Sequence, residues 1–166
     1  GTSTEGTDYT DGSGNVDDIT ISAGSTTGTV NFTPTDDSVY EGNETAIIAI
    51  SSVSGADASE SGSQSVTITI TENESAPTIT LARSAASIDE NSASTVTLTA
   101  TISGVTDSAV TVALDTSGTA TEGTDYGTIS DITISAGATT GTATLDPTDD
   151  NIYDATSNET AGISIS

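Results

Sequence analysis

The sequence contains no cysteine, histidine, methionine or tryptophan, and Arg83 is its only basic residue. Without cysteine there are no disulfides and no thiolate chemistry, and without cysteine and histidine a zinc site or another soft metal site is disfavoured. The 25 acidic residues give a formal net charge of −24, which argues against nucleic acids and anionic membranes as partners. No apolar run approaches the roughly 18 residues of a membrane-spanning helix, so we expect no direct membrane insertion.

Aromatic residues are also few, with four tyrosines and one phenylalanine. A carbohydrate-binding surface or a glycoside hydrolase with two catalytic carboxylates would need aromatic side chains to stack on sugars, and the chain has no histidine, cysteine or lysine for other catalysis. We therefore expect no enzyme. The tyrosines recur in pairs at equivalent positions (Tyr9 with Tyr126, Tyr40 with Tyr153), and we expect them to pack beneath loops rather than to bind sugars.

Much of the sequence occurs twice. The segment TEGTDY at residues 4–9 recurs letter for letter at residues 121–126, and the copies lie about 117 residues apart. This spacing is typical of a domain rather than of a solenoid repeat. We therefore expect about 1.4 repeat units: residues 1–75 as the C-terminal part of one unit, and residues 76–166 as the N-terminal part of the next, whose last strand is missing. We therefore expect the chain to be a window from a longer tandem array.

Apolar residues alternate with threonine and serine in short segments that are separated by turn residues. Examples are Ile19/Ile21, Val30/Phe32, Val66/Ile68/Ile70 and Ile132/Ile134. A period of two with many β-branched residues is typical of strands, and no segment keeps helical spacing over three turns. We predict an all-β fold: an antiparallel β-sandwich of about seven strands per unit.

Acidic residues concentrate in alternate connections between these predicted strands. If successive strands run antiparallel, those connections meet at one pole of the sandwich, and the acids there include Glu90, Asp125 and Asp150. The opposite pole receives mainly Asp57, Glu60 and Asp107. The pattern therefore predicts a dense cluster of carboxylates at one pole.

A cluster of this kind needs a compensating cation, because carboxylates held close together repel one another. Ca²⁺ accepts about six to eight oxygen ligands at flexible geometry, whereas Mg²⁺ requires a tighter octahedron and keeps its waters. The pattern favours calcium. The alternative, that the acids only solvate the ends of the loops, stays open at this point.

The order of the motifs resembles that of the Calx-β family. The segments that carry the resemblance are GTDY, two strands around a glycine turn, TDDSVYEGNETAIIAIS at residues 35–51 and SVTITITENE at residues 65–74. The resemblance covers essentially the whole chain. It implies an immunoglobulin-like β-sandwich that binds Ca²⁺ at one pole, as in exchanger regulatory domains and in large bacterial adhesins and surface proteins.

The resemblance also implies calcium ligands in both copies. In the first unit they are Asp8, Asp37, Glu41, Glu44, Glu72 and Glu74, and in the second they are Glu90, Asp125, Asp150, Asp154 and Glu159. Two departures stand out: the tail reads TENES where the family often has consecutive aspartates, and YDATSNE has two residues more than YEGNE. We expect the first departure to weaken one ion site. The second changes the spacing before Glu159 and so affects its assignment as a ligand.

These observations predict an extracellular, calcium-binding structural module. We expect a calcium-stiffened spacer of a surface adhesin or a subunit of an extracellular fibre, secreted or displayed on the cell surface. Its expected partners are neighbouring repeats of the same protein, head to tail, with self-assembly into filaments. The alternative is an adhesion module that binds a carbohydrate or a protein ligand.

Overall fold

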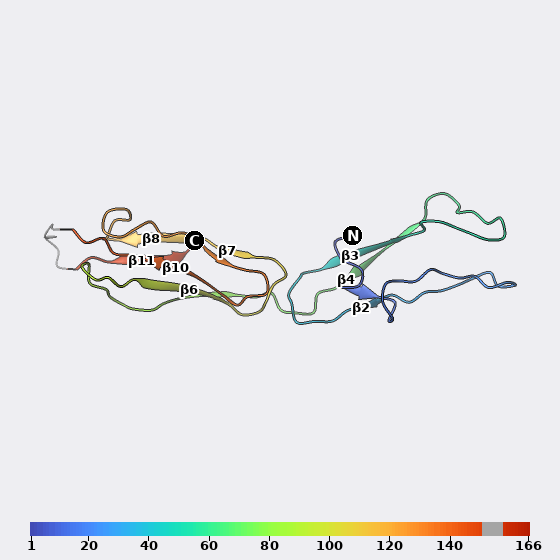
Figure 1. The fold of residues 1–166 in the computed structure, drawn as a ribbon, viewed down its shortest axis with the longest axis horizontal. Helices are drawn as coiled ribbons and strands as arrows, with labels where there is room; N and C mark the ends of the chain where they lie inside the picture. The colour runs from blue at the N-terminus through green and yellow to red at the C-terminus, as the bar shows by residue number, and fades with distance from the viewer. Residues whose placement is uncertain (151–157) are drawn as a thin grey trace. The chain divides into compact units, whose positions relative to one another are not determined.

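The structure is a computed structural model that describes residues 1–150 and 158–166. The described residues form strands and turns, and every strand pair is antiparallel, so the predicted all-β antiparallel fold is confirmed. No helix in these residues is long and apolar enough to cross a membrane. The chain divides into two compact units, Gly1–Glu74 and Ser75–Ser166, here named unit 1 and unit 2 (Figure 1).

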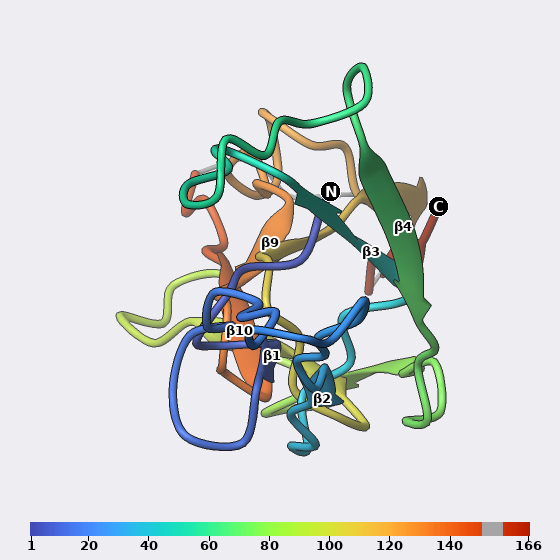
Figure 2. The same cartoon turned by 90° about the vertical axis from the view of Figure 1, so that its right-hand side faces the viewer.

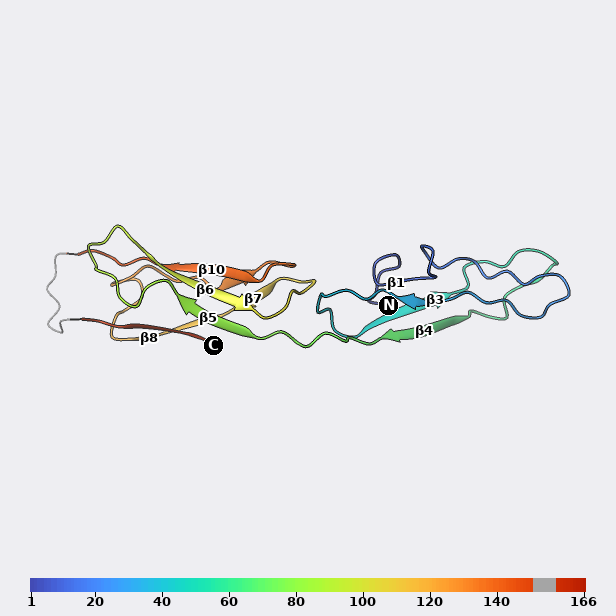
Figure 3. The same ribbon diagram turned by 90° about the horizontal axis from the view of Figure 1, so that it is seen from below.

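Unit 2 contains seven strands within its described residues. They are β5 (Ile79–Arg83), β6 (Val96–Ile102), β7 (Val110–Val112), β8 (Leu114–Gly118), β9 (Ile132–Ile134), β10 (Thr140–Leu145) and β11 (Ala161–Ile165). Strands β10, β6 and β5 pair in that order (Figure 3), β7 pairs with β9, and β11 pairs with β8.

The core of unit 2 follows from the alternation in its strands. On β6, Leu98, Ala100 and Ile102 are buried while the intervening threonines are more exposed. Ile132 and Ile134 of β9 complete this core with Val112. Partly buried residues of β8 and β11 pack against it from the other side, which produces the two layers of a sandwich.

Unit 1 contains four short strands. They are β1 (Tyr9–Thr10), β2 (Thr33–Pro34), β3 (Glu44–Ala49) and β4 (Ser65–Ile70). Strand β1 pairs with β2, and β3 pairs with β4, as Figure 2 shows. Tyr9 and Ala46 are its buried hydrophobic residues, so the packing of this unit is sparse.

The strands expected around Ile19/Ile21 and Val30/Phe32 are absent from unit 1, and here the prediction was wrong. Residues 18–32 form no strand in the structure. In unit 2 the equivalent segments, β9 and β10, pair with β7 and β6. Unit 1 as described contains no counterpart of β6 or β7. Alternation alone does not make a strand when no neighbouring strand is present to accept its backbone hydrogen bonds.

Candidate metal centre

The repeated TEGTDY turn fixes one aspartate in each unit. The Asp8 amide donates to the Thr4 carbonyl at 2.9 Å, while the Thr4 amide donates back to the Asp8 carboxylate. In unit 2 the Asp125 amide donates to the Thr121 carbonyl at 2.9 Å, and the Thr121 amide donates to the Asp125 carboxylate at 2.6 Å. Reciprocal bonds of this kind leave the aspartate little rotational freedom.

The glutamate of the same turn was not singled out from the sequence, and it fastens the turn to the segment that follows. The Glu5 carboxylate accepts the Val16 amide at 2.6 Å. The equivalent Glu122 carboxylate accepts the Ile129 amide at 2.8 Å and the Thr116 hydroxyl at 3.2 Å. The letter-for-letter repeat of TEGTDY was the signal that marked this residue.

The turn also lies against the following acidic loop. In unit 1 the Thr35 amide donates to the Asp8 carbonyl at 2.9 Å, and in unit 2 the Thr148 amide donates to the Asp125 carbonyl at 2.9 Å. These bonds bring two loops together that are separated by more than twenty residues. The predicted meeting of these connections at one end of each unit is therefore seen in the backbone.

The tyrosines support these loops from below. Tyr9 and Tyr126 are buried, and the Tyr9 ring stacks on the Phe32 ring with 4.7 Å between the ring centroids. Tyr40 is half-buried. Tyr153 lies outside the described residues. The prediction that the tyrosines pack beneath loops is confirmed for Tyr9 and Tyr126.

Three carboxylates of unit 1 converge beside this turn. Asp8, Glu41 and Glu44 each offer an oxygen atom, and these oxygens lie within 4.8 Å of one another. Asp8 comes from the repeated turn, Glu41 from the loop before β3, and Glu44 from the first position of β3. Among the described residues, no other three metal-ligating side chains come this close together.

A small pocket of about 40 Å³ surrounds the three carboxylates. Asp37, Glu72 and Glu74 line it as well. The Asp37 carboxylate accepts the Val39 amide at 2.7 Å, which closes a tight turn at the pocket wall. All six acidic residues that were predicted as ligands in the first unit therefore border one pocket.

Glu72 acts as a clamp between the tail of unit 1 and the loop before β3. One of its carboxylate oxygens accepts the amides of Glu41 at 2.7 Å and Gly42 at 2.6 Å. The other accepts the amides of Asn73 and Glu74, each at 2.9 Å. A carboxylate offers about four lone-pair sites. In this conformation the Glu72 carboxylate therefore holds backbone, and it has little capacity left for a cation.

The same bonds keep Glu72 ionised. Donation from the Glu74 amide, and next from the Glu41 amide, lowers the pKa of the Glu72 carboxyl to about 2. The pKa of Glu74 is raised, mainly by a side-chain hydrogen bond with Glu72 and further by its own desolvation and the negative charges of Glu72 and Asp36. The two carboxyls of the tail therefore have opposite pKa shifts, downward for Glu72 and upward for Glu74.

In unit 2 the structure joins part of the predicted set. The Asp150 amide donates to the Glu90 carboxylate at 3.1 Å, so the loop before β6 meets the loop after β10. Glu90, Asp125 and Glu159 line one groove between the layers. Asp154, the repeat equivalent of Glu41, lies outside the described residues.

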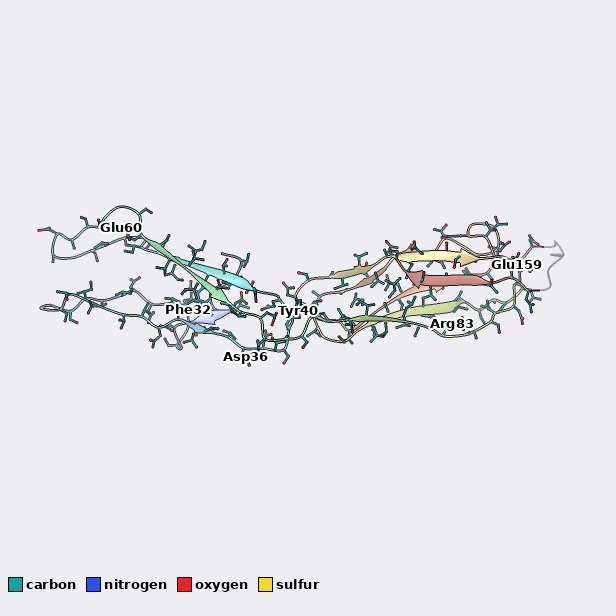
Figure 4. All side chains as sticks on the ribbon, turned by 180° about the vertical axis from the view of Figure 1, so that it is seen from behind. Phe32, Asp36, Tyr40, Glu60, Arg83 and Glu159 are labelled. Atoms are coloured by element: carbon teal, nitrogen blue, oxygen red, sulfur yellow. The ribbon has the colours of Figure 1, made fainter. Side chains whose placement is uncertain are left out.

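Other acids lie elsewhere or make local turns. Figure 4 shows Glu60 at the opposite end of unit 1 from Asp36 and Tyr40. The Asp11 carboxylate accepts the amide and the hydroxyl of Ser13, both at 2.8 Å. These bonds from Ser13 lower the pKa of Asp11. The DGSGNVDD segment therefore contains an ordinary Asx turn.

The Asp8–Glu41–Glu44 cluster fits a hard cation. Its donors are all oxygens, and the irregular loops that supply them suit the flexible coordination of calcium. Space for one water requires roughly 10–15 Å³. A pocket of about 40 Å³ therefore accommodates a cation with a water or two.

The comparisons with known proteins agree with this chemistry. No curated protein and no solved structure matches the chain. The model of the Calx-beta domain matches it twice, over residues 1–74 and 72–166. Calx-beta domains are calcium-binding β-sandwich modules. With both repeats matched along their length, the chain belongs to the Calx-beta domain family.

Proposed function

We propose that this chain is an extracellular calcium-binding structural module that serves as a stiffened spacer in a tandem array or as a subunit of a surface fibre. The observation that carries the proposal is the convergence of Asp8, Glu41 and Glu44 oxygens within 4.8 Å. Membership of a calcium-binding family supports the choice of cation. The large acidic excess supports it too, because the chain has almost no cationic side chain to neutralise the cluster.

In unit 1, Asp8, Glu41 and Glu44 would hold the ion, with Asp37 and Glu74 at the rim of the pocket. A bound Ca²⁺ supplies positive charge that offsets the mutual repulsion of these carboxylates. Asp8 is already oriented by the Thr4 amide. Glu41 is placed by its own backbone bond to Glu72. The chain therefore positions its ligands before an ion arrives, which lowers the cost of binding.

The stiffening role follows from the position of the tail. Glu74 is the last residue of unit 1, and Ser75 is the first of unit 2. An ion that restrains Glu74 also restrains the start of the connection, while Pro77 has a fixed φ and restricts the backbone of Ala76 before it. We therefore expect calcium to reduce bending between neighbouring repeats.

The extracellular location and the lack of catalytic activity are parts of the same proposal. Calcium sites of extracellular modules commonly bind at about 0.1–1 mM, which fits a partly exposed site on loops. The acids of the cluster recur at the same repeat positions, as structural ligands do, and no histidine, cysteine or lysine accompanies them. Neighbouring repeats of the same protein are the expected partners.

Calorimetric titration of the full chain with CaCl₂ tests the proposal. We expect binding at millimolar or lower concentrations, and at least tenfold weaker binding in the first unit for Asp8→Asn or Glu41→Gln. Glu60→Gln is the matched control, because it removes one negative charge at the opposite end of unit 1. No heat at millimolar calcium in the wild type, or an equal loss in Glu60→Gln, would contradict the assignment.

Small-angle X-ray scattering tests stiffening separately. In calcium the distribution of maximum dimensions should narrow, and chelator should restore the broad distribution. Glu74→Gln should reduce the difference between the two buffers. Identical profiles in calcium and chelator would remove the stiffening role even if calorimetry shows binding.

A further inference from the structure

The Glu72 clamp uses a backbone site that is suited to an anion. One Glu72 oxygen accepts the amides of Glu41 at 2.7 Å and Gly42 at 2.6 Å. Gly42 has a φ of +78°, a left-handed conformation that turns successive amides toward one side of the chain. Two successive amides directed at one point form a backbone nest, which is an anion-binding concavity. The Glu72 carboxylate therefore lies in a nest that the loop before β3 provides.

Backbone amides also occupy the second oxygen of Glu72. It accepts the amides of Asn73 and Glu74, each at 2.9 Å. Together with the two bonds in the nest, these bonds match the roughly four lone-pair sites of a carboxylate. Hydrogen bonds to an ionised acceptor are roughly twice as strong as bonds between neutral groups. A rotation of Glu72 toward a cation would break these bonds together, so we expect the carboxylate to stay in the nest when calcium binds.

Two further bonds fix the tail on either side of the carboxylate. The Glu72 amide donates to the Asn43 side chain at 2.9 Å. The side-chain amide of the next residue, Asn73, donates to the Asp36 carboxylate at 2.9 Å. The tail after β4 is thus tied to both acidic loops. These bonds use none of the carboxylate oxygens that form the metal cluster, so they are compatible with a cation in that cluster.

Glu41 belongs to the clamp and to the metal centre at once. Its amide donates to Glu72, and one of its carboxylate oxygens lies within 4.8 Å of oxygens of Asp8 and Glu44. Gly42, which supplies the other amide of the nest, lies between Glu41 and Glu44 in the chain. A cation held by Glu41 and Glu44 restrains the segment whose amides form the nest. The ion and the Glu72 carboxylate therefore favour the same conformation of this segment.

We propose that Glu72 is a positioning residue and not a ligand of the bound calcium, and that it couples the ion to the tail of unit 1 through residues 41–44. The inference rests on the calcium site proposed above. Thermodynamic coupling is reciprocal: calcium reduces the open fraction of the clamp by the same factor by which the clamp raises the calcium affinity. The tail is therefore held more firmly when calcium is bound, although Glu72 supplies no ligand atom.

Amide hydrogen exchange of the full chain, measured by NMR in chelator and in saturating CaCl₂, tests the coupling at Gly42. We expect the Gly42 amide to exchange at least about fivefold more slowly in calcium, which is the lower end of typical coupling. If Glu72 moved to the ion, this amide would lose its acceptor and exchange faster. The Gln64 amide is the matched reference, because it donates to the Glu60 carboxylate at the opposite end of unit 1. Its exchange should be equal in the two buffers.

Two variants separate the clamp from the ion. Glu41→Gln keeps the backbone amide of the clamp and removes one charged ligand. At a calcium concentration that saturates only the wild type, Gly42 in this variant should exchange as slowly as wild type in chelator and respond weakly to calcium. Glu72→Ala should speed Gly42 exchange in both buffers and weaken calcium binding by about the measured coupling factor. Unchanged exchange at Gln64 shows that the variants remain folded.

Slower Gly42 exchange in calcium, lost in Glu41→Gln, supports the proposal. A purely structural clamp gives equal rates in the two buffers, and a Glu72 ligand gives a faster rate in calcium. Either result overturns the proposal if calorimetry still shows calcium binding that Glu41→Gln weakens, and the calcium site itself then stands. Absence of binding heat overturns the calcium site, and the coupling with it.

Discussion

Ile19 and Ile132 occupy the same position in the repeated segment DITISAG, yet Ile19 is 57 % exposed and Ile132 is fully buried. The difference lies in the strands around them. Ile132 belongs to β9, which pairs with β7 and packs against β6 and β10. Unit 1 as described has no equivalents of β6 or β7 around Ile19. Within residues 1–166, the two isoleucines of this segment are therefore exposed in unit 1 and buried in unit 2.

Replacing each of the two isoleucines with alanine should lower the free energy of unfolding by clearly different amounts. Ile132→Ala should destabilise unit 2 by about 2–4 kcal/mol, because it leaves a cavity in a packed core. Ile19→Ala should cost less than about 0.5 kcal/mol, since an exposed side chain has little packing to lose. Urea unfolding of the full chain, followed by circular dichroism, measures both. Equal losses of unfolding free energy for the two variants would mean that Ile19 is buried in solution.

Gly141 should resist even the smallest side chain. A Cβ atom there would lie 2.4 Å from the Thr133 carbonyl oxygen, so β9 and β10 could not keep their spacing. Gly141→Ala should destabilise unit 2 by about 1–3 kcal/mol through overpacking. Gly127→Ala is the control, because the nearest atom to its added Cβ is 3.9 Å away. Equal thermal midpoints for the two variants would refute the steric explanation.

Glu72 should make unit 1 sensitive to acid in calcium-free buffer. Its pKa is lowered from 4.5 to about 2 in the folded unit. Between these values the unfolded chain binds more protons than the folded chain, so the contribution of Glu72 is fully present above pH 4.5 and disappears as the pH falls toward 2. The raised pKa of Glu74 acts in the opposite sense, because protonation favours the folded form.

The Gly42 amide reports on this titration, since it donates to Glu72 at 2.6 Å. Its proton chemical shift, followed by NMR in chelator, should titrate with a midpoint near the lowered pKa of Glu72. Glu72→Gln should abolish the step, and Glu74→Gln should keep it. A Gly42 midpoint at the ordinary glutamate value would show that the clamp does not form in solution.

Glu5 should influence calcium binding without serving as a ligand. Its carboxylate accepts the Val16 amide and thereby holds the turn that presents Asp8. Loss of such supporting bonds typically costs at least about tenfold in metal affinity. We expect Glu5→Ala to weaken calcium binding by about tenfold and Glu5→Gln, which keeps an acceptor oxygen, to restore most of it. If Glu5→Gln binds as weakly as Glu5→Ala, charge rather than positioning is responsible.

The strands of unit 2 were predicted well from the sequence, because each alternating segment there has a neighbouring strand with which it pairs. Leu98, Ala100 and Ile102 alternate with threonines and are all buried. In unit 1 the same reasoning failed for Ile19 and Val30, since burial depends on strands that the alternation itself does not encode. The sequence pattern placed the acids at one end of each unit. The pattern did not show that the Glu72 carboxylate oxygens accept hydrogen bonds from backbone amides. Those bonds depend on how the tail of unit 1 meets the loop before β3.

The Glu72 clamp has a mechanical consequence. The Glu72 amide also donates to the Asn43 side chain at 2.9 Å, so this single residue joins the tail to residues 41, 42 and 43. Tension applied through the connection that starts at Ser75 reaches these bonds before it reaches the pairing of β4 with β3. The bonds of the carboxylate weaken when it takes up a proton. We therefore expect the force that the tail of unit 1 withstands to fall as its surroundings become more acidic.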